Sequence, residues 1–233
     1  MKIAIIGAMK DEINLLDNII TNKIYSYIGN YQIIYGKCNN FHIALLLSGI
    51  GKVSAAISTT ILIEKFSPTV IINVGCAGSL TSKLKIGDIA ISTHTCYYDV
   101  DLSIFGYHLG QVPECPLLFN ANAKLVKLIQ LCIQKLQYNY LTGTICTGDK
   151  FLIDINNTRY INKMNIIPIA VDMEGAAISH VCYRFNIPFI VLRVISDVVN
   201  TNSYLLFKQQ IKLINIKIFN IIKMFLSNNH FYI

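Results

Sequence analysis

Three acidic residues follow predicted buried strands, where a carboxylate could do chemistry. Glu12 follows an apolar run at the N-terminus, and Glu174 and Asp197 each follow an apolar run in the last third of the chain. An acid at the start of a helix also stabilises the helix dipole, so each residue taken alone has a purely structural explanation. Because the chain has only 13 acidic residues, three of them at strand ends favour a common site.

The sequence around Asp197 favours a proton donor at this position. It closely follows the mainly apolar run 191–195, and burial at the end of such a strand disfavours the charged form of a carboxyl group. A protonated acid opposite an ionised carboxylate can cleave a glycosidic bond, since the acid protonates the leaving group and the base activates water. Adenine leaves more easily once a ring nitrogen is protonated. The same logic extends to nucleosides, and an acid near the base with a water held opposite it would account for Asp197 and Glu12.

Two glycine-rich segments, residues 49–51 and 75–78, each follow an apolar strand. Neither completes the G-x-G-x-x-G pattern of a dinucleotide site, and the sequence has no G-x-x-x-x-G-K-[ST] loop, so no nicotinamide or ATP cofactor is expected. Glycines at strand ends let the backbone approach a small ligand closely. Both segments therefore predict turns that line a crevice at the carboxyl edge of a sheet.

The alternation of apolar strands and amphipathic helices predicts a layered α/β fold. The predicted strands are residues 2–8, three short strands within 25–47, and residues 70–74, 87–96, 141–146, 168–171 and 188–195. The predicted helices are residues 10–22, 52–66, 121–137, 173–185 and 203–226. No linker or internal repeat interrupts this order, so we expect a single domain over residues 1–233.

The predicted loop 99–120 is long for a compact domain, and it carries apolar residues that include Phe105, Tyr107 and Pro113. Exposed apolar residues are a liability on a monomer, which favours a loop that closes over a pocket or packs on a second subunit. A surface loop packed on itself is the alternative.

Composition excludes several classes of function. The 20 basic and 13 acidic residues give a net charge of +7, but the lysines are scattered and no nucleic-acid reading motif appears. Charged residues interrupt every apolar stretch before it reaches the roughly 18 residues of a membrane-spanning helix. We therefore expect a soluble protein without nucleic-acid or membrane partners.

Cysteine and histidine usage points away from metal chemistry. The seven cysteines contain no C-x-x-C pair, and the five histidines contain no H-E-x-x-H motif. Seven is also an odd number, which favours reduced, buried cysteines in a cytoplasmic protein over a disulfide framework. No metal ion and no cofactor are expected.

Five short motifs carry a family resemblance: IIGAM (5–9) followed by Glu12, SGIGKV (48–53), NVGCAG (73–78), VDME (171–174) and RVISD (193–197). In order and spacing they resemble the 5′-methylthioadenosine/S-adenosylhomocysteine nucleosidases, and FGY (105–107) and GDKF (148–151) agree as well. The resemblance implies the nucleoside phosphorylase/nucleosidase fold, a central mixed, twisted sheet flanked by helices. It also implies a homodimer.

The resemblance assigns the catalytic roles by position. Asp197, supported by Ser196, would protonate N7 of adenine, while Glu12 would activate the attacking water with Arg193 close by. Cys76 stands where the family usually has serine, next to Ala77 and Gly78, and a thiol is a weaker hydrogen-bonding group than a hydroxyl.

The resemblance also assigns the substrate contacts. Phe151 would stack on adenine and the backbone of Leu152 would pair with its edge, while Glu174 would bind the ribose hydroxyls above Met173. Asp172 stands where glutamate is frequent and is expected to support the site. The pocket for the 5′ substituent would be lined by Ile50, Leu102 and Phe207, and completed by Phe105, Tyr107 and Pro113 of a partner subunit.

Two other functions remain to be weighed within this fold. A phosphorylase holds a phosphate dianion, usually with arginine, but the first arginine of this chain is Arg159 and the Glu12 carboxylate would repel phosphate. A binding protein without turnover has no need to keep both an acid and a base. Hydrolysis of methylthioadenosine, S-adenosylhomocysteine and 5′-deoxyadenosine is therefore expected, and the preference among them and aminofutalosine stays open.

Overall fold

The computed structural model describes residues 1–152, 159–198 and 203–227, and side chains within 153–160 and 199–209 lie outside that description. The strands are β1 (Lys2–Gly7), β2 (Thr21–Ile28), β3 (Tyr31–Cys38), β4 (Phe41–Leu47), β5 (Val70–Ser79), β6 (Ile89–Tyr97), β7 (Phe119–Asn120), β8 (Tyr140–Thr147), β9 (Pro168–Asp172) and β10 (Phe189–Val198). The α-helices are α1 (Lys10–Ile13), α2 (Lys52–Phe66), α3 (Ala123–Lys135), α4 (Arg159–Asn162), α5 (Gly175–Arg184) and α6 (Ser203–Ser227), with 3₁₀ turns η1 (Leu16–Ile19) and η2 (Ser103–Phe105).

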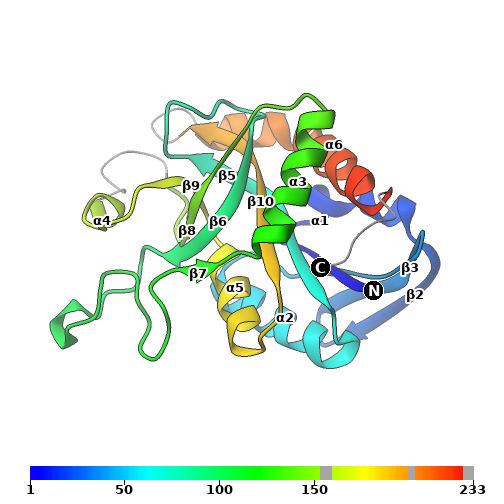
Figure 1. Cartoon of the computed structure of the whole chain (residues 1–233), viewed down its shortest axis with the longest axis horizontal. Coiled ribbons are helices and arrows are strands. Elements are labelled where there is room, and N and C mark those ends of the chain that lie inside the picture. The colour runs from blue at the N-terminus through cyan, green and yellow to red at the C-terminus, as the bar shows by residue number, and fades with distance from the viewer. Residues whose placement is uncertain (153–158, 199–202, 228–233) are drawn as a thin grey trace.

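The strands form one mixed sheet in the order β10-β6-β8-β9-β5-β1-β4-β3-β2, with β7 added to β6 (Figure 1). β1 is parallel to β4 and β5, and β5 is parallel to β10. Strand β9 runs antiparallel to β5, and β10 also pairs with β6. The strands β5, β10, β6, β8 and β9 therefore close into a ring, which confirms the predicted mixed α/β sheet.

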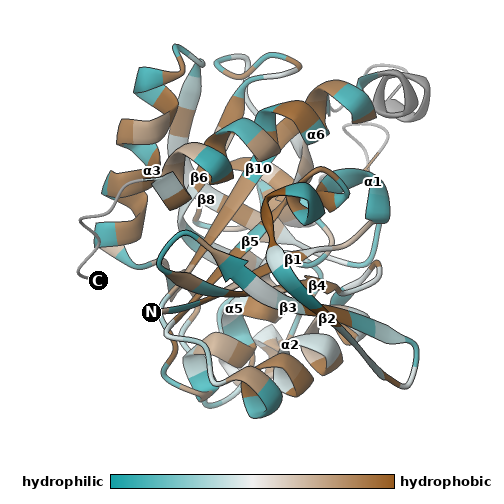
Figure 2. Cartoon of the chain, turned by 90° about the vertical axis from the view of Figure 1, so that its right-hand side faces the viewer, coloured by the Kyte–Doolittle hydropathy of each residue, from teal (hydrophilic) through white to brown (hydrophobic). Residues whose placement is uncertain are grey.

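Alternation along β1 explains how the helices cover both faces of the sheet. Ile3 and Ile5 pack in one buried cluster with residues of α3 and α6, whereas Ala4 and Ile6 pack in another with residues of α2 and α5. Figure 2 shows these two helical layers on opposite sides of the strands. Within the described residues, no helix is long and apolar enough to cross a membrane.

The predicted helix over residues 10–22 is wrong. The structure has α1 and η1 there, and β2 already begins at Thr21, which pairs with Lys37 of β3. The apolar residues Ile13, Leu16 and Ile20 are all buried, so the helical spacing was real. Two short turns that face the same core satisfy that spacing as well as one helix does.

The predicted turn at residues 75–78 is also wrong, because β5 continues through Ser79. β10 pairs with β5 along this whole stretch, and β9 pairs with its last two residues. The ladder is irregular between Ile195 and Asp197. Such a bulge redirects side chains, and Ser196 and Asp197 consequently both face one cavity. Asp197 therefore lies inside a strand, where the sequence predicted a position just after one.

Candidate functional site

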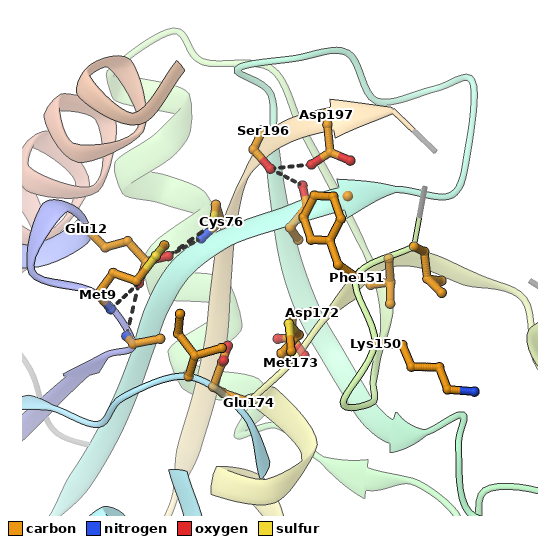
Figure 3. Close-up of a pocket in the computed structure, with 16 residues that line it drawn as sticks. Met9, Glu12, Cys76, Lys150, Phe151, Asp172, Met173, Glu174, Ser196 and Asp197 are labelled. Atoms are coloured by element: carbon orange, nitrogen blue, oxygen red, sulfur yellow. Dashed lines mark hydrogen bonds between the residues drawn. The ribbon is translucent and has the colours of Figure 1, made fainter. Parts of the chain in front are cut away.

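One cavity of about 410 Å³ brings most of the predicted site residues together (Figure 3). Of the predicted residues, it is lined by Glu12, Ile50, Cys76, Ala77, Gly78, Phe151, Leu152, Asp172, Met173, Glu174, Ser196 and Asp197. The side chains of Glu12 and Asp197 lie on opposite sides of the view in Figure 3. The two carboxyl groups thus share one cavity, as the sequence predicts.

The Glu12 carboxylate is buried and held by four donors. Its Oε2 accepts from the backbone N–H groups of Ala8 and Met9, both at 3.0 Å. Its Oε1 accepts from the backbone N–H of Cys76 at 3.0 Å and from the Cys76 thiol at 3.1 Å. Met9 is the N-cap residue of α1 and Glu12 belongs to its first turn, so the carboxylate also lies at the positive end of that short helix. These contacts fix the orientation of Glu12 before any ligand binds.

Cys76 acts as a hydrogen-bond donor in this arrangement. Burial, and then the neighbouring Glu12 carboxylate, raise the pKa of the Cys76 thiol well above its ordinary value. The thiol therefore keeps its proton at neutral pH and donates a hydrogen bond to Glu12. The cysteine thus fills the place of the serine that the family resemblance leads one to expect.

Gly75 leaves the space that the Glu12 carboxylate occupies. A Cβ atom at this position would lie 2.9 Å from Glu12 Oε1 and 3.3 Å from Arg193 Nη1. Such contacts are shorter than side chains normally allow, so the glycine is required for close approach. Its lack of a side chain places the carboxylate directly against β5.

Asp197 is paired with the preceding serine. The Ser196 hydroxyl donates to Asp197 Oδ1 at 2.6 Å, and the same hydroxyl lies 3.3 Å from the carbonyl oxygen of Ala77. Both side chains are 2% exposed. The hydroxyl orients the carboxyl group, and the surrounding protein excludes most of the water from it.

Glu174 occupies the third acidic position of the cavity. Its Oε1 accepts from the backbone N–H of Gly51 at 2.9 Å. Burial, and then the nearby Asp172 carboxylate, raise the pKa of Glu174 to about 7. Arg193 and the Gly51 N–H oppose this shift. The group therefore changes its charge near neutral pH.

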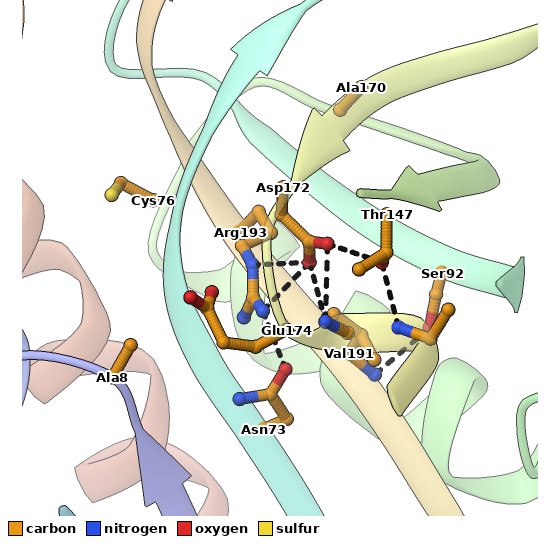
Figure 4. Close-up of polar contacts among 12 residues, drawn as sticks. Ala8, Asn73, Cys76, Ser92, Thr147, Ala170, Asp172, Glu174, Val191 and Arg193 are labelled. Carbon is orange, nitrogen blue, oxygen red and sulfur yellow. Dashed lines mark hydrogen bonds and ion pairs between the residues drawn. The ribbon is translucent and has the colours of Figure 1, made fainter. Parts of the chain in front are cut away.

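Arg193 is not among the residues that line the cavity, and Figure 4 shows its contacts with Asp172 and Asn73. Its Nη2 forms an ion pair with Asp172 Oδ2 at 2.8 Å and donates to Asn73 Oδ1 at 2.6 Å. Burial alone would lower the pKa of the guanidinium group, but Asp172 and the other nearby carboxylates outweigh burial and raise it. Its Nη1 lies on the side of Glu12, since a Cβ atom at Gly75 would be 3.3 Å from Arg193 Nη1 and 2.9 Å from Glu12 Oε1. That Arg193 lies close to the attacking water stays a prediction.

Besides its ion pair with Arg193, Asp172 accepts hydrogen bonds from two neighbouring segments. It accepts from the Thr147 hydroxyl at 2.5 Å and from the backbone N–H of Gly175 at 3.1 Å. Gly175 begins α5, so Asp172 caps that helix while it neutralises Arg193. This network agrees with the predicted supporting role and holds the segment that carries Glu174.

Comparisons with known proteins show the family to which the chain belongs. The model of the phosphorylase superfamily matches residues 2–227. A 5′-methylthioadenosine/S-adenosylhomocysteine nucleosidase of Buchnera aphidicola subsp. Schizaphis graminum (strain Sg) is 45% identical over 227 residues, 97% of this chain and 97% of that protein. The chain belongs to this nucleosidase family. Members of this family are N-glycosyl hydrolases, and the chain is therefore an enzyme of that class.

Two solved nucleosidases extend the likeness to three dimensions. The Neisseria meningitidis enzyme in complex with methylthio-immucillin-A has a TM-score of 0.94 at 32% identity, over 97% of this chain and 98% of that chain. The Colwellia psychrerythraea enzyme in complex with adenine has a TM-score of 0.93 at 34% identity, over 97% and 95% of the two chains. The sheet described above is thus the nucleoside phosphorylase/nucleosidase fold.

The predicted residues of loop 99–120 do not line this nucleosidase's own cavity. Leu102, Phe105, Tyr107 and Pro113 are not among the residues that line the cavity of the single chain, and their place in a 5′ pocket stays a prediction. The reason is visible in Figure 1, where the loop between β6 and β7 projects from the body of the molecule. Phe207 is part of α6, and its side chain lies outside the described residues.

Sequence reasoning missed four residues of the cavity: Ala8, Met9, Lys150 and Val171. Ala8 and Met9 contribute backbone N–H groups, which no residue type reveals. They do belong to the glycine-containing segment after the first strand, and Glu12 three residues after Met9 completes the spacing of a capping box. Among the described residues, no group of three His, Cys, Asp or Glu side chains is placed to hold a metal ion.

Proposed function

We propose that the chain hydrolyses the N-glycosidic bond of 5′-methylthioadenosine and S-adenosylhomocysteine, and also of 5′-deoxyadenosine. The products are adenine and the 5′-substituted ribose. The observation that carries this proposal is the shared cavity of Glu12 and Asp197. One buried acid for the base and one oriented carboxylate for water are what glycosidic cleavage requires.

In this mechanism Asp197 is the general acid. It protonates N7 of adenine while the C1′–N9 bond breaks, so that adenine leaves as a neutral molecule and the electron pair of the bond stays on the purine. Ser196 keeps the carboxyl group oriented through its 2.6 Å hydrogen bond. Positive charge develops on the ribose ring in the oxocarbenium-like transition state.

Glu12 is the group that activates water. It accepts a proton from the water molecule that attacks C1′, and the oxygen of that water becomes the anomeric hydroxyl of the product. The backbone N–H groups of Ala8, Met9 and Cys76 hold its carboxylate in place. We assign the Cys76 thiol the supporting role of a donor to Glu12 Oε1.

The remaining cavity residues would position the substrate. Phe151, 44% exposed at the edge of the cavity, stacks on adenine, and the backbone of buried Leu152 pairs with its edge. Glu174 accepts hydrogen bonds from the ribose hydroxyls, with Met173 against the sugar. Ile50 lines the pocket for the 5′ substituent.

Electrostatics favour water over phosphate as the second substrate. None of the described side chains that line the cavity is an arginine. The guanidinium of Arg193 is committed to Asp172 and Asn73, and Arg184 donates to the sulfur of Cys115. The Glu12 carboxylate, in contrast, faces the cavity and would repel a dianion.

An adenine-release assay tests this choice. We expect the purified chain to convert methylthioadenosine to adenine and free methylthioribose in phosphate-free buffer, because water is the attacking group. Added phosphate should leave the rate and the sugar product unchanged. An absolute requirement for phosphate, with a sugar phosphate as product, would refute hydrolysis. Parallel assays with S-adenosylhomocysteine, 5′-deoxyadenosine and aminofutalosine give the substrate preference.

We also propose that the enzyme is a homodimer in which loop 99–120 completes the partner's cavity. Exposed apolar side chains support an interface: Val53 and Ile57 on α2 are 69% and 47% exposed, and Ile104 and Phe105 on the loop are 87% and 74% exposed. Phe105, Tyr107 and Pro113 would close the partner's 5′ pocket. Leu102, which belongs to the same loop, and Phe207 of α6 would line the 5′ pocket as the family resemblance implies.

Residues 1–233 would act as one nucleosidase domain in the cytoplasm. All seven cysteines are free, six of them buried and Cys76 only partly so, as is usual in a reducing compartment.

The ionisation of Glu174 predicts how substrate binding depends on pH. Because the pKa of Glu174 is raised to about 7, lowering the pH through 7 protonates it, and a neutral acid accepts hydrogen bonds from two ribose hydroxyls less well than a carboxylate. KM for methylthioadenosine should therefore rise as the pH falls from 8.5 to 5.5, by up to about tenfold per pH unit below the pKa.

The control for this prediction is Glu174→Gln, which stays neutral at every pH. Its KM should be raised at pH 8.5 and should vary little with pH, as measured from initial rates across the same range. The assignment of the titration to Glu174 is contradicted if the variant keeps the pH dependence of the native enzyme.

A further inference from the structure

Three segments meet at the side chain of Lys52, the first residue of α2, and two of them, 50–52 and 148–152, contribute residues to the cavity lining. Its Nζ donates to both carboxylate oxygens of Asp99, at 2.8 and 2.7 Å. The same Nζ lies 3.7 Å from Asp149 Oδ2. Asp99 begins loop 99–120, and Asp149 belongs to the segment 148–152 that carries Phe151. These three residues are called the Lys52 cluster below.

Backbone groups tie the Lys52 cluster together as well. The N–H of Asp149 donates to Asp99 Oδ2 at 2.9 Å, and the N–H of Lys52 donates to Asp149 Oδ1 at 2.8 Å. The N-cap of α2 is Gly51, which has no side chain to cap the helix. Asp149 therefore supplies the cap from a distant segment, and its charge is favourable at the positive end of the helix.

The ammonium group of Lys52 is what makes this arrangement possible. Two carboxylates in one cluster repel each other, and the side chains of Lys52 and Asp99 are only 23% and 17% exposed, so solvent screens that repulsion incompletely. Lys52 Nζ also lies 5.6 Å from the centre of the Tyr97 ring, a distance at which a cation is attracted to the aromatic face.

Each member of the cluster is one residue away from a group that contacts the cavity walls. Gly51, before Lys52, donates its N–H to Glu174 Oε1 at 2.9 Å. Tyr98, before Asp99, donates its hydroxyl to the carbonyl oxygen of Lys150 at 3.0 Å. Ile50 and Phe151 are two residues from cluster members and line the cavity themselves. Lys52 does not line the cavity.

We propose that Lys52 is a positioning residue for substrate binding. Its ammonium group holds Asp99 and Asp149 against the start of α2. It thereby sets the spacing between segment 148–152, where Phe151 stacks on adenine, and segment 50–52, where Ile50 contacts the 5′ substituent. This inference rests on the proposed function of the cavity. It differs from a merely stabilising ion pair, which would support the fold without affecting affinity for the substrate.

The variant Lys52→Met tests the proposal, since methionine keeps an unbranched apolar stem of similar length and removes the charge. A matched control is Lys23→Met, which removes a similarly exposed ion pair, Lys23 Nζ to Asp17 Oδ1 at 2.8 Å, away from the cavity. We expect Lys52→Met to raise KM for methylthioadenosine by about 10–100-fold, because segments 50–52 and 148–152 would no longer be held at the spacing that contacts the substrate; each tenfold corresponds to about 1.4 kcal/mol of binding free energy. Its kcat should change about threefold or less, and Lys23→Met should leave both constants unchanged.

Hydrogen exchange without any ligand separates this proposal from the proposed function. The Asp149 amide is itself a donor within the Lys52 cluster, so the segment 148–152 should exchange at least about tenfold faster in Lys52→Met than in the native chain. The segment should keep its native exchange rate in Lys23→Met. This comparison holds whether or not the native chain releases adenine.

The outcomes are distinct. If the native chain does not cleave methylthioadenosine, the proposed function fails, and exchange at 148–152 still decides whether Lys52 positions that segment. Equal exchange in the two lysine variants overturns the proposal. In an active enzyme, a KM for Lys52→Met that matches that of Lys23→Met overturns it as well, as does a loss confined to kcat.

Discussion

Asp197→Asn should lower kcat for adenine release by about 10²–10⁴-fold, which is the range that a positioned general acid contributes. Asparagine keeps the shape of the side chain and can accept the hydrogen bond from Ser196. It cannot transfer a proton to N7, so adenine would have to leave as an anion. Affinity for adenine should change much less than kcat, as measured by calorimetry beside the kinetic assay.

The control for this prediction is Asp11→Asn, the same chemical change at an exposed residue of α1. It should have native kinetics and native adenine binding. A methylthioribosyl donor with a leaving group that departs as a stable anion, such as p-nitrophenolate, sharpens the test. Asp197→Asn should cleave this donor at nearly the native rate, because no leaving-group proton is needed. Unchanged adenine release from methylthioadenosine would remove Asp197 from the role of the acid.

Residue type and order along the chain predicted the acidic part of the site well. Glu12 lies near the carboxyl end of β1 and Asp197 near the carboxyl end of β10, and both strands run parallel to β5. Parallel strands bring their carboxyl ends to one edge of a sheet, so two such positions converge. The prediction depended only on the hydrophobic pattern that marks the strands, which is strong in this chain.

The glycines of residues 75–78, where the Glu12 carboxylate approaches β5, were compatible with either a turn or a strand. Residues 75–78 read as a turn because glycine is typical of turns, yet they extend β5 and pair with β10. The need for glycine comes from Glu12, 63 residues earlier, whose Oε1 would lie 2.9 Å from a Cβ atom at Gly75. A contact between distant segments leaves no local signal in the sequence.

The Lys52 cluster illustrates the same limit for charged side chains. Lys52 is 47 residues from Asp99 and 97 residues from Asp149. Their ion pairs depend on how three loops approach one another after the sheet has formed. The sequence shows a glycine-rich turn followed by lysine, which is compatible with an exposed helix start. Only the fold reveals that this lysine is 23% exposed and lies against Asp99 and Asp149.

Glu12→Gln should lower kcat by about 10²–10⁴-fold for a different reason, loss of the base that accepts the proton of water. The amide also disturbs the four donors around it. Its oxygen can accept from Ala8 and Met9, but its NH₂ group then faces the N–H and thiol of Cys76, which are donors too. We expect the free energy of unfolding to fall by about 1–3 kcal/mol from this mismatch, as measured by denaturant unfolding.

The matched control is Glu64→Gln on the exposed face of α2, which should preserve both activity and stability. The p-nitrophenyl donor separates the two carboxyl roles, because its hydrolysis still needs an activated water. Glu12→Gln should therefore be as slow with this donor as with methylthioadenosine, whereas Asp197→Asn should recover. Recovery of both variants, or of Glu12→Gln alone, would contradict the assignment of acid and base, since only the base acts on a step that every leaving group shares.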